Sequence, residues 1–250
     1  MSLYVLTFLV GAIIGSFLNV CIYRLPRNES LLLPASHCPR CRSPIPVYDN
    51  LPILSFLILR GRCRHCKATI SWRYPLVELI NALGYLYLFS LFGVSWIGIV
   101  YALLFSALLV VTFIDLEHKI IPDTITLPGI VIGLLAASTV LPPGFISALA
   151  GLLLGGGLFY LVAVVSPGGM GGGDIKLIAM IGAFLGWQDV LLTILIGAFA
   201  GSLVGLFLIL CKGKGRKYPV PFGPFLALGA VASLFWREEI LMWYLLWFQS

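Results

Sequence analysis

Long apolar runs separated by short polar segments dominate the chain and set its expected architecture. A helix that crosses a bilayer needs roughly 17–25 predominantly apolar residues. The segment at 174–187 is short, so it would either extend into its flanks or span only part of the bilayer. The pattern predicts an all-α polytopic membrane protein with about eight transmembrane helices. Their expected ranges are 2–22, 75–93, 95–114, 124–141, 145–166, 174–187, 189–211 and 222–236.

Composition agrees with this pattern, since 60% of the 250 residues are hydrophobic and 10% are charged. Soluble domains are about 45–50% apolar and about 25% charged. The tail 240–250 is apolar and aromatic, so it would prolong the last helix or lie at the membrane interface. We expect three domains: a first transmembrane helix at 1–23, a cytoplasmic tetracysteine domain at 24–74, and a membrane-embedded domain at 75–250.

Basic residues indicate the orientation of the chain. The loop 24–73 holds nine of them, and 15 of the 16 Lys and Arg residues fall on one side of the eight-span topology. The positive-inside rule places that side in the cytoplasm and the N-terminus outside. The first span has no basic residue before it, which favours an uncleaved anchor over a signal peptide. The net charge of +6 reflects this topology and favours contact with membrane lipid over nucleic acid.

Two C-x2-C pairs lie in the loop 24–73, with 21 residues between them. Four thiolates in this arrangement suit one closed, structural zinc site. The alternatives are two disulfides or unbound cysteines, and the cytoplasmic placement disfavours disulfides. His37 and His65 are alternative ligands or exposed neighbours. The expected zinc ligands are Cys38, Cys41, Cys63 and Cys66.

Two aspartates lie where apolar runs meet polar segments. Asp115 ends a long apolar run, and Asp174 opens another one after a glycine loop. A carboxylate at a membrane boundary is costly and is a functional-site hypothesis. Two carboxylates roughly 3–5 Å apart share one proton, so one can take a proton from water while the other polarises a carbonyl. That chemistry hydrolyses a peptide without a metal. The alternative is two separate interfacial aspartates that serve ion transport.

Residues around these aspartates have expected roles of their own. Gly171 and Gly173 allow positive φ and close backbone approach, which would let an extended peptide lie beside Asp174; otherwise the glycine run is a flexible connector. Lys176 would position a substrate or extend to the interface. Asp123 is expected to be the N-cap of the helix that follows it.

Other classes of function fit less well. The chain has no H-E-x-x-H motif for a membrane zinc protease, and His118 is the sole candidate base of a serine enzyme, without an obvious serine partner. Two readings stay open beside the protease. One is a proton- or cation-coupled transporter that uses Asp115 and Asp174, and the other is a scaffold whose zinc ribbon docks a cytoplasmic partner.

Four segments together resemble the bacterial prepilin peptidases, also called type IV leader peptidases, a family of G-x-G-D intramembrane aspartyl proteases. These segments are GSFLNVCIYRLP at 15–26, the CPRC and CRHC pairs, FIDLEHKIIPD at 113–123 and GMGGGDIKL at 169–177. The resemblance implies that Asp115 and Asp174 are the catalytic pair. It also implies that the substrates are precursors of type IV pilins or of the pseudopilins of type II secretion. Cleavage would occur at the cytoplasmic face of the inner membrane, after a glycine that ends a short basic leader.

The resemblance further implies a second activity. Many relatives with the tetracysteine loop methylate the new N-terminus with S-adenosylmethionine. The loop carries no G-x-G-x-x-G fingerprint that would identify a nucleotide site. Asn19, Arg24 and Glu29, near the entry to the loop, are loose candidates for this activity.

Overall fold

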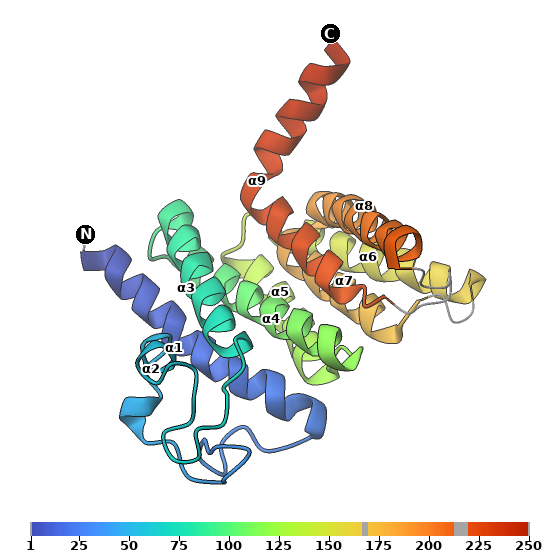
Figure 1. Cartoon of the computed structure of the whole chain (residues 1–250). Helices are drawn as coiled ribbons and strands as arrows, with labels where there is room; N and C mark the ends of the chain where they lie inside the picture. Colours follow the sequence, from blue (N-terminus) through green and yellow to red (C-terminus); the bar gives the residue numbers. More distant parts are fainter. Residues whose placement is uncertain (1, 167–169, 213–219, 250) are drawn as a thin grey trace. The chain divides into compact units, whose positions relative to one another are not determined.

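The computed structural model describes residues 2–166, 170–212 and 220–249, which are helical or irregular, with two isolated β-bridges and no strand (Figure 1). This confirms the predicted all-α fold. Each of the eight apolar segments predicted from the sequence coincides with a helix. The elements are α1 (Ser2–Arg24), η1 (Leu25–Arg27), η2 (Val47–Asp49), α2 (Leu54–Ile58), α3 (Arg73–Phe92), α4 (Trp96–His118), α5 (Asp123–Thr139), α6 (Gly144–Val165), α7 (Gly172–Leu185), α8 (Trp187–Lys212) and α9 (Gly223–Gln249).

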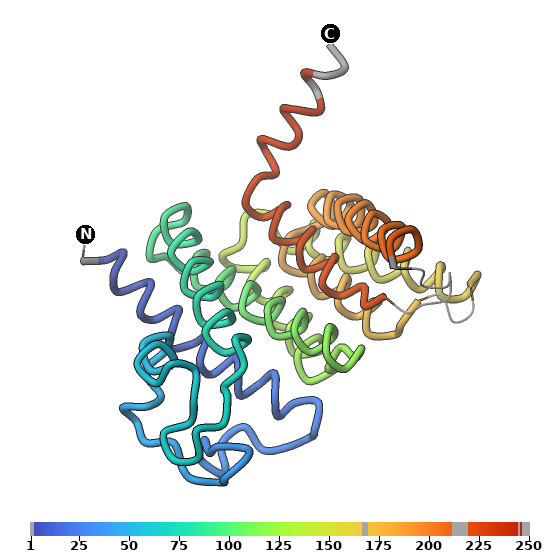
Figure 2. The backbone as a smooth tube through the Cα atoms, in the orientation of Figure 1, coloured from blue at the N-terminus to red at the C-terminus, as the bar shows by residue number. Residues whose placement is uncertain are grey.

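Five of the described helices, α1, α3, α4, α6 and α8, are long and apolar enough to cross a membrane. Helix α5 is apolar and has 17 residues, and α7 has 14. Helix α9 contains a non-helical residue, Trp236, with φ −131° and ψ 23°. The helix changes direction there and continues, so the apolar tail prolongs α9 beyond the predicted end at 236 (Figure 2).

The chain forms two compact units, residues 1–110 and 111–250. In the first unit, α1 packs closely on α3 through two glycines one turn apart. A Cβ at Gly11 would lie 2.8 Å from the Cα of Ala82, and one at Gly15 would lie 2.7 Å from the Cα of Glu78. Such small-residue spacing lets helix backbones approach where the hydrophobic effect gives no driving force.

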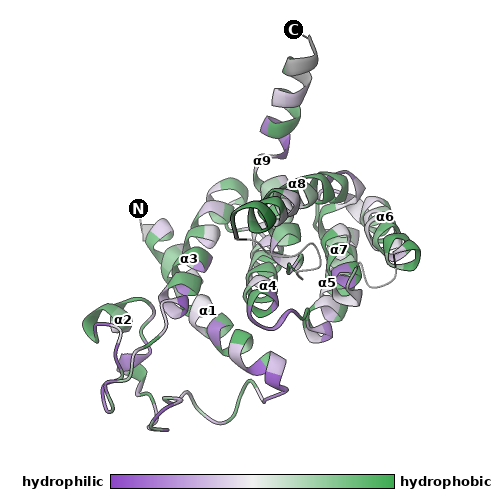
Figure 3. Ribbon diagram, turned by 45° about the vertical axis from the view of Figure 1, so that its right-hand side comes forward, coloured by the Kyte–Doolittle hydropathy of each residue, from purple (hydrophilic) through white to green (hydrophobic). Residues whose placement is uncertain are grey.

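In the second unit, α7 forms the core, and α5, α6, α8 and α9 contact it. Every residue from Leu177 to Leu185 is buried. Helix α6 comes closest, since a Cβ at Gly182 would lie 2.4 Å from the carbonyl carbon and oxygen of Gly151. Apolar residues cover α6 and α8 (Figure 3), and their exposed side chains, Phe199 among them, suit contact with lipid.

The loop between η1 and α3 belongs to the first unit and has little regular structure besides η2 and α2. It contains the four cysteines. The three-domain division predicted from the sequence, with boundaries after residues 23 and 74, stays a prediction.

Candidate active site and candidate metal centre

Asp115 lies in the last turn of α4, and its side chain accepts a hydrogen bond from the start of α9. The residue is 5% exposed. Its Oδ2 accepts a hydrogen bond of 2.9 Å from the backbone N–H of Gly223, the first residue of α9. The first N–H groups of a helix have no intrahelical partner and form the positive end of its dipole. The start of α9 therefore holds this carboxylate in place.

Asp174 also lies at a helix start, in the first turn of α7. Its carboxylate lies close to the backbone of Gly171, the N-cap residue, since a Cβ at Gly171 would lie 2.9 Å from Asp174 Oδ2. Its Oδ1 is buried and has no hydrogen-bond partner among the described residues. A buried carboxylate oxygen without a partner is costly and indicates a bound water, proton or ligand.

Ile121, in the linker between α4 and α5, lies against the starts of both α7 and α9. A Cβ at Gly173 would lie 2.8 Å from the Cβ of Ile121. A Cβ at Gly223 would lie 3.3 Å from Ile121 Cδ1 and 2.8 Å from the Oδ2 of Asp115. Asp174 is within electrostatic range of Asp115. The second unit therefore brings the two predicted aspartates to one place.

Lys176 and Asp123 form an ion pair beside this site. The Nζ of Lys176 lies 2.7 Å and 2.6 Å from the two carboxylate oxygens of Asp123. The pair joins the first residue of α5 to the N-terminal part of α7. The prediction that Asp123 caps α5 is wrong, because Pro122 is the N-cap residue and no side chain caps this helix. The Asp123 carboxylate forms an ion pair with Lys176 instead.

The glycines before Asp174 provide space for neighbouring atoms. Gly168 and Gly169 lie outside the described residues. Gly171 has φ −77°, and Gly173 lies inside helix α7, so neither shows the positive φ expected. A Cβ at Gly171 would lie 2.9 Å from Asp174 Oδ2, and Gly173 lies against Ile121. Both positions therefore exclude a side chain by close approach.

The four cysteines come together in the first unit. Their Sγ atoms lie within 4.8 Å of one another. The distances are 3.8 Å between Cys38 and Cys66 and 4.0 Å between Cys41 and Cys63. A tetrahedral zinc with Zn–S of about 2.3 Å separates its sulfurs by about 3.8 Å. The cluster therefore fits a zinc ion.

The two cysteine pairs have the same local fold, 25 residues apart. The N–H of Arg42 donates to Cys38 O at 2.8 Å, and that of Lys67 donates to Cys63 O at 3.0 Å. Both donors have left-handed backbones, with φ 57° and 58°. The backbone N–H of Cys41 lowers the pKa of the Cys38 thiol to about 7, and that of Cys66 lowers the pKa of Cys63, whereas desolvation and the neighbouring thiols raise the pKa of Cys41 to about 11. The lowered pKa values of Cys38 and Cys63 favour the thiolate, which is the form that binds metal.

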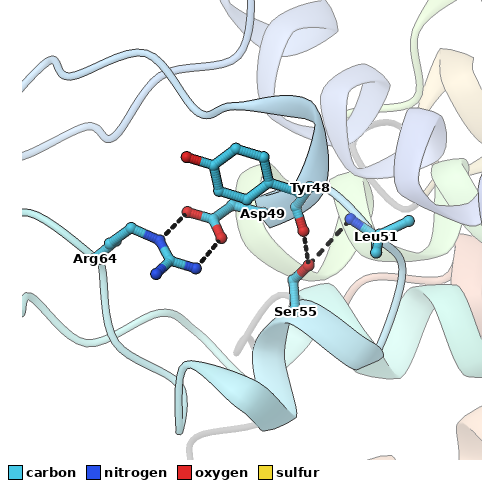
Figure 4. Close-up of polar contacts among 5 residues, drawn as sticks. All are labelled: Tyr48, Asp49, Leu51, Ser55 and Arg64. Carbon is cyan, nitrogen blue, oxygen red and sulfur yellow. Dashed lines mark hydrogen bonds and ion pairs between the residues drawn. The ribbon is translucent and has the colours of Figure 1, made fainter.

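An ion pair supports the second cysteine pair from outside (Figure 4). The guanidinium of Arg64 donates two hydrogen bonds to the carboxylate of Asp49, at 2.7 Å and 2.6 Å. The Arg64 guanidinium lowers the pKa of the Asp49 carboxyl. The Oγ of Ser55 donates to the carbonyl oxygen of Tyr48 at 3.1 Å, which ties the same turn to α2. His37 and His65, the alternative ligands, are exposed.

Sequence reasoning missed Gly223 and Ile121. The run PFGP at 221–224, just before an apolar segment, signals a helix start. It does not tell which carboxylate that helix start meets, because the partner lies 108 residues earlier in the chain.

Family models match both parts of the chain. The Bacterial Peptidase A24 N-terminal domain matches residues 9–92, and the Type IV leader peptidase family matches residues 102–206, which include both aspartates. No solved structure matches the chain.

Curated relatives match nearly the full length, and each is named a prepilin leader peptidase/N-methyltransferase. The protein of Aeromonas salmonicida is 38% identical over 96% of this chain and 93% of its own length. That of Pseudomonas aeruginosa is 36% identical over 96% and 92%. That of Legionella pneumophila is 36% identical over 97% and 94%. The chain therefore belongs to the type IV leader peptidase family.

Proposed function

We propose that this protein is a membrane aspartyl endopeptidase that removes the leader from type IV prepilins or pseudopilins and then N-methylates the new N-terminus. The names of the relatives support both activities. The observation that carries the peptidase assignment is the meeting of Asp115 and Asp174 at the starts of α9 and α7.

The two carboxylates have different hydrogen-bond environments. Asp115 accepts the Gly223 N–H, whereas the Oδ1 of Asp174 is buried without a partner among the described residues. We infer that the pair shares one proton. The ionised member takes a proton from water, and the protonated member donates a hydrogen bond to the scissile carbonyl, as carboxylate pairs do in aspartic proteases. Neither carboxylate alone can do both.

Methylation forms a bond between the methyl carbon and the nitrogen of the new N-terminus. The bond from that carbon to the donor's sulfur breaks, the sulfur keeps the electron pair, and the amine releases one proton to water. S-adenosylmethionine supplies this methyl group when it is bound.

We further infer that the four cysteines hold one structural zinc ion, with Cys38, Cys41, Cys63 and Cys66 as its ligands. All four positions are thiolates, so the ion would cross-link the two cysteine pairs and leave no position open for catalysis.

Basic residues on one side of the topology support an N-terminus outside, with the aspartates and the cysteine loop in the cytoplasm. The site would then meet the basic leader at the inner face of the inner membrane.

The test is cleavage of a prepilin-like peptide by the purified protein, followed by mass spectrometry of the leader fragment. Asp115→Asn and Asp174→Asn should each lower the rate by at least about 100-fold, because each removes acid–base catalysis. Glu239→Gln is the matched control, since this exposed carboxylate lies in the second half of α9. Near wild-type turnover in either aspartate variant would refute the pair, and ion flux without cleavage would favour a transporter.

A further inference from the structure

The first unit contains a cavity beside the C-terminal part of α1. Its volume is about 380 Å³, and its walls come from α1, from residues 31–36 and from residues 47–52. Small-molecule sites usually have volumes of about 300–1,000 Å³ with mostly apolar walls and a few polar groups. The lining here is mostly apolar, and its polar side chains are Ser16, Arg24, Ser36 and Asn50.

Arg24 is a buried cation in the wall of this cavity. It is 7% exposed, and its two Nη atoms donate to the carbonyl oxygens of Ser30 at 2.7 Å and Pro34 at 2.6 Å. Among the described residues, no carboxylate forms an ion pair with it. Burying a charge without an opposite charge is costly. The two hydrogen bonds also use only two of its five N–H donors. An anionic group bound in the cavity would offset this cost.

Asn19, Arg24 and Glu29, the candidates for methylation from the sequence, have different surroundings in the structure. Asn19 faces α3, where its amide donates to the carbonyl oxygen of Tyr74 at 3.0 Å, and it does not line the cavity. The Glu29 side chain is exposed. Arg24 alone among the three lines the cavity.

We propose that this cavity binds the methyl donor and that Arg24 pairs with the carboxylate of the donor's amino-acid part. The proposal rests on the N-methyltransferase half of the proposed function. A guanidinium matches a carboxylate in a bidentate geometry. Both aspartates lie within the match to the Type IV leader peptidase family, whereas the whole cavity wall lies within the separate N-terminal match at 9–92. The two activities then occupy different units of the chain.

The experiment measures binding of S-adenosylmethionine to the purified full-length protein by isothermal titration calorimetry. Arg24→Leu should weaken binding by about 10–100-fold, the effect of losing a hydrogen bond to a charged group. Arg27→Leu is the matched control. It removes the same charge from an exposed side chain that stacks on the Tyr23 ring, outside the cavity, and it should bind the donor as the wild type does.

A ligand-side variant keeps the test independent of misfolding. Decarboxylated S-adenosylmethionine should bind the wild type about 10–100-fold more weakly than the intact donor. Arg24→Leu should no longer distinguish the two ligands. The zinc content of the same preparations reports whether the first unit, which holds both the cysteine cluster and the cavity, is folded, and leader cleavage reports the same for the second unit.

Three outcomes would overturn the proposal, and they differ from one another. If the wild type binds S-adenosylmethionine and its decarboxylated form equally, Arg24 does not recognise the carboxylate, and the methyltransferase function is not affected. If Arg24→Leu leaves donor binding intact and instead weakens binding to vesicles that contain phosphatidylglycerol, the cavity holds a lipid phosphate. If the wild type binds no donor at all, the methyltransferase half of the proposed function fails and leader cleavage is unaffected.

Discussion

Replacing Gly223 by alanine would place a methyl group against the Asp115 carboxylate. The added Cβ would lie 2.8 Å from Asp115 Oδ2 and 3.3 Å from its Cγ, both too short for an unstrained contact. The carboxylate must move, and it then loses the 2.9 Å hydrogen bond from the Gly223 N–H. A hydrogen bond to a charged group contributes about 1.5–3 kcal/mol. If that energy orients the carboxylate in the transition state, the rate of cleavage should fall about 10–150-fold.

The assay is kcat/KM for leader cleavage of a prepilin-like peptide, with thermal unfolding of the same preparation. Alanine favours a helix over glycine, so the unfolding temperature should not fall through the helix itself. Gly205→Ala is the control, because a Cβ there meets no described atom within 4 Å. A Gly223→Ala rate within twofold of wild type would refute the idea that this backbone N–H holds Asp115 for catalysis.

Three further changes probe the glycine loop, the cysteine cluster and the core. Gly173→Ala should lower the rate of cleavage at least tenfold, because the added Cβ would lie 2.8 Å from the Cβ of Ile121. Gly172→Ala is the control and should cleave normally, since a Cβ there meets no described atom within 4 Å. Equal rates in the two variants would support the view that the glycine loop is only a connector. Elemental analysis of the wild type should find about one zinc per chain. Cys38→Ser should lower this zinc content while leader cleavage persists. A wild type that is metal-free when prepared without chelator would contradict the proposed zinc site. Gly182→Leu should destabilise the second unit by roughly 1–3 kcal/mol through overpacking against α6, as measured by thermal unfolding. Gly157→Leu is the control, because a Cβ at Gly157 meets no described atom within 4 Å. Equal unfolding temperatures of the two variants would disprove close packing of α6 on α7.

The sequence predicted most of the fold because each helix carries its own signal. Eight apolar runs coincide with α1 and with α3 to α9, since helix formation in a membrane needs only an apolar segment that satisfies its own backbone. The cysteine spacing also predicted the cluster, because C-x2-C turns are local. The end of α9 was less predictable. The sequence left open whether the tail 240–250 prolongs the last helix, and the kink at Trp236 does not follow from an apolar count that Arg237 interrupts.

Contacts between distant segments could not be predicted in the same way. Asp115 and Asp174 were identified as candidates by type and position, but the hydrogen bond from Gly223 depends on where α9 begins relative to α4. The Asp123 side chain illustrates the same limit. Its local sequence favours a cap, yet Pro122 takes the N-cap position of α5 and Asp123 is the first residue of the helix. The carboxylate instead accepts two hydrogen bonds from Lys176 of α7, a partner 53 residues away that the local sequence does not reveal.

The shortness of α7 has a consequence for how water reaches the aspartates. Its 14 residues span about 21 Å at 1.5 Å per residue, whereas the hydrocarbon layer is about 30 Å thick. A lipid-facing helix of this length would force the bilayer to thin around it. Because other helices enclose α7, its length is free of that constraint. If the missing depth of about 9 Å lies at the Asp174 end of α7, solvent and substrate can reach the proposed site at a level that lipid tails occupy elsewhere.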